Sequence, residues 1–133
     1  MKVTVYKHMI ILSVLLLINS VAAVAKNNNN LIYNTEEKDG LVVSQLVYKM
    51  DNGQLTNYEK FSYTYNDQRR VASQEKEKWN AAKNNWEKEV CIHYTYSDGK
   101  KHITYEKWNN RKKAYEAVPE MNVSVEDTEA PDK

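Results

Sequence analysis

Residues 86–108 read WEKEVCIHYTYSDGKKHITYEKW and decide the fold class of this 133-residue chain. Two segments rich in Tyr, Thr, Val and Ile flank the tripeptide Ser97-Asp98-Gly99. β-Branched and aromatic residues favour strands, and Asp-Gly accepts the positive φ that a two-residue hairpin turn requires. The stretch therefore predicts an antiparallel β-hairpin.

Alternation along the first segment predicts two unlike faces of the sheet. Trp86 and Lys88 would share a face with Ile92, whereas Cys91 and His93 would lie on a mostly polar face. This pattern is typical of an antiparallel sheet that is solvated on one side.

The hairpin is part of an internal repeat. Tyr63–Asp67 matches Tyr94–Asp98, and Glu77–Asn80 matches Glu106–Asn109. Tyr48–Gly53 resembles a degenerate earlier copy. One repeat is two strands with a short turn at one end and a longer turn at the other, and each repeat needs a neighbour to bury its face.

The repeat predicts an all-β fold, a single antiparallel β-meander of about six strands built from hairpin repeats. Residues 73–83 also have helical propensity, but their match to a later strand favours a strand. Pro119 indicates an edge strand or a strand that ends early. The predicted strands are Leu41–Met50, Leu55–Tyr65, Arg70–Trp79, Trp86–Tyr96, Lys101–Trp108 and Ala114–Val123.

The two ends of the chain differ from this pattern. Residues 1–25 have the order of a secretory signal peptide: Lys2 and Lys7, an apolar run over Met9–Ile18, and Ala23-Val24-Ala25 before a cleavage point. We expect export to the periplasm or the medium, with no membrane span after cleavage. Residues 26–40 read as a polar linker, 41–123 as the β-meander repeat domain, and 124–133 as an acidic disordered tail.

Composition limits the kind of core and the kind of partner. Without residues 1–25 the chain keeps 17 basic and 18 acidic residues, a net charge of −1, which disfavours nucleic acid as a partner. Cys91 is the only cysteine, so an intrachain disulfide is impossible. Ten tyrosines and three tryptophans favour a thin sheet covered by amphipathic side chains.

The Tyr-Thr-Tyr-Asn-Asp units and the paired Trp-Asn turns resemble small secreted Bacteroidetes proteins classed as a domain of unknown function, family number 3836. The resemblance covers residues 31–123 and implies an exported, sheet-forming protein with no catalytic residues to transfer. A looser similarity links Tyr65–Val71 to the tyrosine-aspartate repeats of bacterial surface shells, although Arg69 stands where glycine is usual.

Four aromatic residues flank the longer turns, namely Trp79, Trp86, Trp108 and Tyr115. They could form a stacking platform for sugar rings. They could equally be two cross-strand pairs, Trp79 with Trp86 and Trp108 with Tyr115, that hold each hairpin closed. The second interpretation is the more economical one.

A second set of side chains has the chemistry of metal ligands. With Asp98-Gly99 as a two-residue turn, Cys91, His93, His102 and Glu106 share one face. No dense ligand motif accompanies them, so no cofactor is predicted and these residues form only a weak candidate for a metal site.

These observations favour an exported, non-enzymatic binding or interaction module at the cell envelope, with a protein or a glycan as its ligand. A small secreted hydrolase or metal-dependent enzyme that uses the Cys91/His93 strand face is the alternative. A structural subunit of a surface assembly is a third interpretation. The open edges of such a sheet would also allow self-association.

Overall fold

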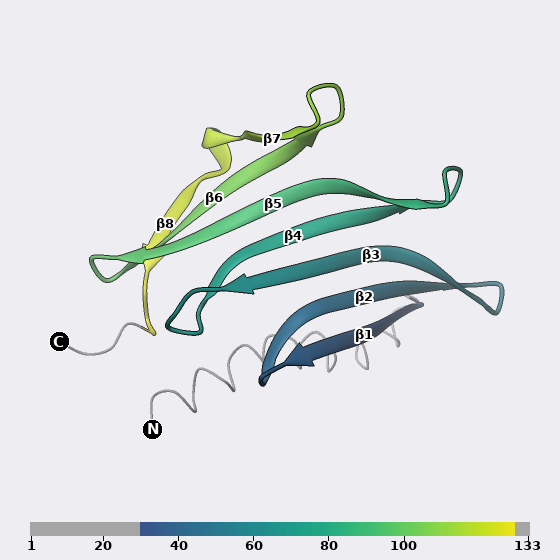
Figure 1. Cartoon of the computed structure of the whole chain (residues 1–133), viewed down its shortest axis with the longest axis horizontal. Coiled ribbons are helices and arrows are strands. Elements are labelled where there is room, and N and C mark those ends of the chain that lie inside the picture. Colours follow the sequence, from purple (N-terminus) through teal and green to yellow (C-terminus); the bar gives the residue numbers. More distant parts are fainter. Residues whose placement is uncertain (1–29, 130–133) are drawn as a thin grey trace.

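The computed structural model describes residues 30–129, which form a single curved antiparallel sheet (Figure 1). The predicted all-β meander is confirmed: the first seven strands pair in chain order. Eight strands are present where about six were predicted. They are β1 Leu31–Lys38, β2 Leu41–Asp51, β3 Gln54–Tyr65, β4 Val71–Asn80, β5 Asn85–Ser97, β6 Lys100–Asn109, β7 Ala114–Ala117 and β8 Val123–Glu126.

Three hairpins close through two-residue turns in which both residues have positive φ. They are Asp39-Gly40, Asn52-Gly53 and Asp98-Gly99, with φ between 47° and 78°. This is the type I′ geometry that matches the twist of paired strands, and it is accessible mainly to Gly, Asn and Asp. The sequence predicts a turn at Asp98-Gly99, and Asn52-Gly53 falls between the predicted strands Leu41–Met50 and Leu55–Tyr65, whereas Asp39-Gly40 was read as linker.

The longer turns each begin with an asparagine that organises the turn. Asn66 Oδ1 accepts hydrogen bonds from the backbone N–H groups of Gln68 and Arg70, at 3.0 and 2.9 Å. Asn80 and Asn109 accept backbone N–H groups in the same way within the next two longer turns. Such side-chain bonds replace ladder hydrogen bonds where the chain reverses.

Both ends of the described chain depart from the prediction. Leu31–Lys38 was read as part of a linker, but it pairs with β2 along its whole length. The predicted last strand, Ala114–Val123, is interrupted at Pro119, which opens a short 3-10 helix over Pro119–Met121. The chain then resumes as β8, whose last three residues fall in the predicted disordered tail, and pairs with β6 beyond the end of β7. The predicted signal peptide lies outside the described residues.

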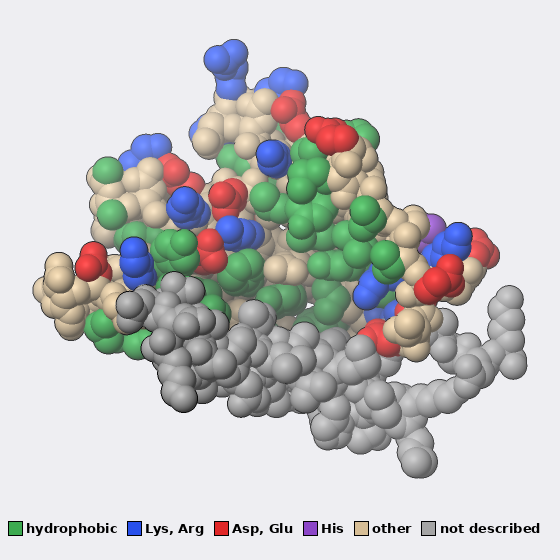
Figure 2. All heavy atoms as spheres, turned by 180° about the vertical axis from the view of Figure 1, so that it is seen from behind, with side chains coloured by type: hydrophobic (Ala, Val, Ile, Leu, Met, Phe, Trp, Pro, Cys, Tyr) green, Lys and Arg blue, Asp and Glu red, His purple; other side chains and the backbone are tan. Residues whose placement is uncertain are grey.

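Residues directly opposite one another in the ladders share a face of the sheet. One face, here the apolar face, carries the row Tyr63, Gln74, Ile92 and Tyr105. Figure 2 looks onto this face, where hydrophobic side chains gather over the middle of the sheet. The opposite face, here the polar face, carries the row Ser62, Glu75, Cys91 and Glu106.

The most buried side chains belong to the second strand. Val42, Gln45 and Val47 of β2 are each 1% exposed. The Tyr65 hydroxyl, on the neighbouring strand, donates to the Val42 carbonyl oxygen at 2.6 Å. Within residues 30–129 the fold has one layer, so packing of side chains along the curved sheet takes the place of a core between two layers.

A bulge in β5 changes which of its side chains share a face, so part of the predicted alternation is wrong. Val90 lies opposite Lys76, but Lys88 lies opposite Glu77, so Glu89 is an extra residue on β5. An extra residue reverses the alternation beyond it. Lys88 and Trp86 therefore lie on the polar face with Cys91, and their predicted place beside Ile92 is wrong.

No helix among the described residues is long and apolar enough to span a membrane.

Candidate functional site

The aromatic residues form two cross-strand pairs, as the more economical interpretation of the sequence predicts. Trp79 lies opposite Trp86, with ring centroids 5.1 Å apart and planes inclined at 66°. Trp108 lies opposite Tyr115, with centroids 5.0 Å apart and planes inclined at 70°. Both are edge-to-face contacts, the favoured geometry for aromatic rings, and each holds one hairpin closed.

The two hairpins separate from each other beyond the bulge. The ladder between β5 and β6 ends at Val90 and Lys107. Outward from that point β5 pairs only with β4, and β6 pairs only with β7. The ends of the two hairpins therefore diverge like a fork (Figure 1).

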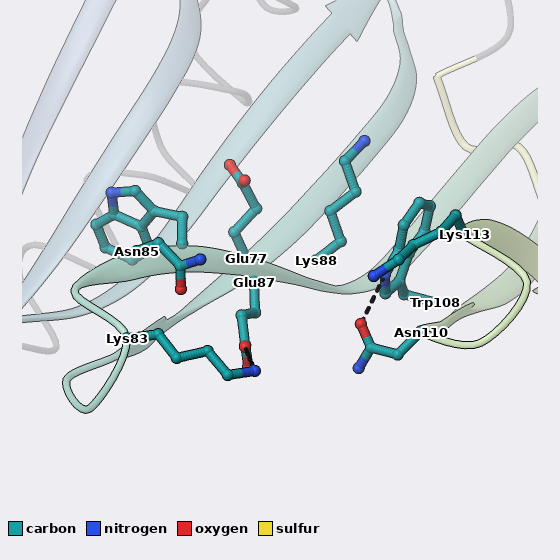
Figure 3. Close-up of a pocket in the computed structure, with 9 residues that line it drawn as sticks. Glu77, Lys83, Asn85, Glu87, Lys88, Trp108, Asn110 and Lys113 are labelled. Atoms are coloured by element: carbon teal, nitrogen blue, oxygen red, sulfur yellow. Dashed lines mark hydrogen bonds and ion pairs between the residues drawn. The ribbon is translucent and has the colours of Figure 1, made fainter.

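An open groove of about 330 Å³ lies in this fork, and we call it the fork groove (Figure 3). One tryptophan from each hairpin lines it, with charged and amide side chains around them. The lining residues are Glu77, Lys83, Asn85, Trp86, Glu87, Lys88, Trp108, Asn110 and Lys113.

Only two of the four predicted aromatic residues lie in the groove. Trp86 and Trp108 line the fork groove, whereas their partners Trp79 and Tyr115 do not. The Trp108 indole N–H donates to Asn110 Oδ1 at 3.1 Å, which fixes the ring relative to the turn (Figure 3). Each partner ring supports a groove tryptophan from the side.

Charged side chains in the groove are held by their neighbours. Lys83 donates to Glu87 at 2.7 Å, and this hydrogen bond, with a second from Asn80, lowers the pKa of the Glu87 carboxyl. Lys88 lies 5.2 Å from the centroid of Trp108 and 5.4 Å from that of Tyr115, within the range of cation–π attraction. Two acids and three lysines line the groove, so it is close to neutral.

The structure brings together three of the four candidate metal ligands. His93 Nε2 lies 3.6 Å from Cys91 Sγ and 2.8 Å from Glu106 Oε2. The fourth, His102, lies apart: its ring nitrogens bond the hydroxyls of Ser97 and Ser124, at 3.1 and 2.7 Å. Three of the four candidate side chains therefore lie together, and His102 lies apart from them.

A network on the polar face links the cluster to the fork groove. Glu75 lies opposite Cys91 in the ladder and accepts hydrogen bonds from Tyr115 and Lys88, at 2.8 and 3.1 Å. Burial of the thiol, and then the charges of Glu75 and Glu106, raise the pKa of Cys91. Reactive cysteines have a lowered pKa, so this environment disfavours a nucleophilic role.

Sequence reasoning missed most of the groove lining. Lys83, Asn110 and Lys113 lie in two of the longer turns, and Asn85 is the first residue of β5. The composition of these turns predicts turns but does not indicate a shared groove. These residues lie close together because the ladder between β5 and β6 ends at Val90 and Lys107.

Comparison with known proteins gives the family. A family model described as "Family of unknown function (DUF3836)" matches residues 1–126. The chain belongs to the DUF3836 family. This confirms the resemblance drawn from the tyrosine and tryptophan units.

Solved structures agree with this membership. A DUF3836 family protein from Bacteroides vulgatus is 46% identical, with a TM-score of 0.71, over 74% of this chain and 100% of that one. A DUF3836 family protein from Parabacteroides distasonis is 24% identical, with a TM-score of 0.67, over 76% of this chain and 94% of that one. A Bacteroides fragilis protein of unknown function, 23% identical, shares the fold with a TM-score of 0.62, over 70% of this chain and 69% of that one. No match is found among curated proteins.

Proposed function

We propose that this DUF3836 protein is an exported, non-enzymatic carbohydrate-binding module whose ligand lies in the fork groove. The observation that carries the proposal is that Trp86 and Trp108, from separate hairpins, line one groove. Aromatic faces pack against the C–H surfaces of sugar rings, and fixed rings lose little conformational freedom on binding. The signal-peptide pattern of residues 1–25 supports the proposal that the protein is exported.

The polar lining suits a ligand rich in hydroxyl groups. Asn85 and Asn110 carry amides that both donate and accept hydrogen bonds, and Glu77 and Lys88 add charged groups on the face that carries the tryptophans. The near-neutral lining favours an uncharged glycan over a polyanion. The open groove of about 330 Å³ is at the small end of ligand sites, which favours a short stretch of a longer chain.

A hydrolase acting through Cys91 has less support. The thiol is buried and its raised pKa keeps it protonated at neutral pH. Glycoside hydrolysis requires two carboxylates that flank the glycosidic bond to be cleaved, and the fork groove is too open to enclose such a bond.

The test is calorimetric titration with short, uncharged mannan, xylan, glucan and chitin oligosaccharides. We expect one of these to bind, and Trp86→Ala or Trp108→Ala to weaken binding by about tenfold or more per ring, as for a stacking contact of about 1.4 kcal/mol. Trp79→Ala is the matched control, because Trp79 does not line the groove; it removes only the ring that supports Trp86, so we expect a smaller loss of binding. Equal loss in Trp79→Ala and Trp86→Ala would contradict the proposal.

A further inference from the structure

The side chains of Cys91, His93 and Glu106 converge on the polar face. One potential ligand atom from each lies within 4.8 Å of the other two. Cys91 and His93 are two residues apart on β5 and so point to the same side, and Glu106 of β6 lies directly opposite Cys91. The ladder itself, and not a flexible loop, holds the three groups together.

We propose that Cys91, His93 and Glu106 bind a divalent transition-metal ion, with Zn²⁺ as the preferred ion. A thiolate, an imidazole and a carboxylate are the three protein ligands that zinc accepts. The sulfur and nitrogen donors disfavour Ca²⁺ and Mg²⁺, which select oxygen ligands. The proposal is independent of sugar binding in the fork groove.

The distances suit a tetrahedral ion. Zn–S of about 2.3 Å and Zn–N of about 2.05 Å at a tetrahedral angle place sulfur and nitrogen about 3.6 Å apart. The separation of Cys91 Sγ and His93 Nε2 is 3.6 Å. The His93–Glu106 contact of 2.8 Å is a hydrogen bond, and the ion would replace it by opening this pair to about 3.3 Å.

The partial exposure of the cluster leaves room for a fourth ligand. The Cys91 residue is 7% exposed, whereas the side chains of His93 and Glu106 are 43% and 31% exposed. Cys91 would release its thiol proton to solvent when the metal binds, and an ion held from below by the resulting thiolate would be open to water or to a ligand from solution. Three protein ligands with one open position are an arrangement that zinc adopts where water or another molecule completes its coordination.

The experiment uses Co²⁺ as a spectroscopic substitute for Zn²⁺ on purified protein kept reduced. We expect visible absorption of four-coordinate cobalt and a near-ultraviolet thiolate-to-cobalt band, both abolished by Zn²⁺. His93→Gln and Glu106→Gln should weaken cobalt binding by more than about tenfold, and Cys91→Ser should remove the near-ultraviolet band. His102→Gln is the matched control and should bind as the original protein does, because His102 lies outside the cluster.

Circular dichroism of each variant shows whether it is folded. His93→Gln and Glu106→Gln change partly exposed side chains, so we expect the sheet to tolerate both substitutions. Failure of the folded original protein to give the near-ultraviolet band would overturn the proposal. So would a loss of binding in His102→Gln equal to that in His93→Gln. Oligosaccharide binding is measured without metal, so either proposal can fail alone.

Discussion

Arg70 and Asp127, 57 residues apart in the chain, form a two-pronged ion pair with N–O distances of 2.7 and 2.6 Å. Their side chains are only 7% and 4% exposed. The Arg70 guanidinium also lies 3.4 Å from the centroid of the Tyr96 ring. This pair fastens the segment after β8 to the turn before β4, in a region that composition alone predicts to be disordered.

Removing one partner of this pair should destabilise the fold. Asp127→Ala leaves a buried guanidinium without its main counter-charge, so we expect a loss of about 3 kcal/mol in the free energy of unfolding. Urea unfolding followed by circular dichroism measures it. The control is Glu126→Ala, an exposed acid one position away, which should change stability by less than about 0.5 kcal/mol. Equal effects of the two substitutions would show that the pair is unimportant.

The same pair should give the protein an acid-sensitive stability. Hydrogen bonds from Arg70 hold the pKa of Asp127 below its ordinary value. The stabilisation is therefore fully present above the pKa of about 3.9 in the unfolded chain, and it is lost as the pH falls through the lowered folded value. The stability gap between the original protein and Asp127→Ala should be constant near neutrality and shrink below about pH 4. Urea unfolding at a series of pH values tests this, and a gap that widens with acid would refute it.

Half-buried tyrosines should make the fold sensitive to base. Burial raises the pKa of Tyr63 and of Tyr65 to about 12. The unfolded chain ionises its tyrosines near pH 10, so stability should fall as the pH rises from about 10 to 12. Ultraviolet titration of tyrosinate should show late-ionising groups, and Tyr63→Phe should remove one of them. A single transition near pH 10 in the folded protein would contradict this.

Two repeat-equivalent tyrosines should contribute equally to stability. The Tyr65 and Tyr96 hydroxyls donate to the carbonyl oxygens of Val42 and Val71, at 2.6 and 2.8 Å. Tyr65→Phe and Tyr96→Phe should each cost about 1 kcal/mol, measured by urea unfolding. Tyr105→Phe serves as the control, because its hydroxyl makes no hydrogen bond in the part of the chain that the structure describes. A cost for Tyr105→Phe as large as the other two would argue against a specific role.

The Trp79–Trp86 contact should be measurable by a double-mutant cycle. Edge-to-face pairs contribute about 0.5–1.5 kcal/mol beyond the area that they bury. We expect a coupling energy in that range from the unfolding of Trp79→Ala, Trp86→Ala and the double variant. The equivalent cycle on Trp108 and Tyr115 should give a similar value. Additive effects would mean that the rings only fill space.

Local patterns predicted the meander, because Asp98-Gly99 and the repeated tyrosine units specify hairpins without distant contacts. The same reasoning could have found β1, since Asp39-Gly40 is an equal turn signal. β8 could not be predicted, because its pairing with β6 and the Arg70–Asp127 contact beside it join segments that are far apart in the sequence. The position of Trp86 on the polar face was also unpredictable, because the bulge at Glu89 reverses the alternation without a sequence signature. The fork groove follows from the same irregularity.

The central claim is that two tryptophans from separate hairpins receive one ligand. The chain has three tryptophans, so a ¹⁵N-labelled sample gives three indole N–H signals in an NMR spectrum. Titration with the oligosaccharide that binds in calorimetry should shift the signals of Trp86 and Trp108 together and leave that of Trp79 nearly unchanged. Signals that all stay in place, or a shift of Trp79 as large as that of Trp86, would contradict the account.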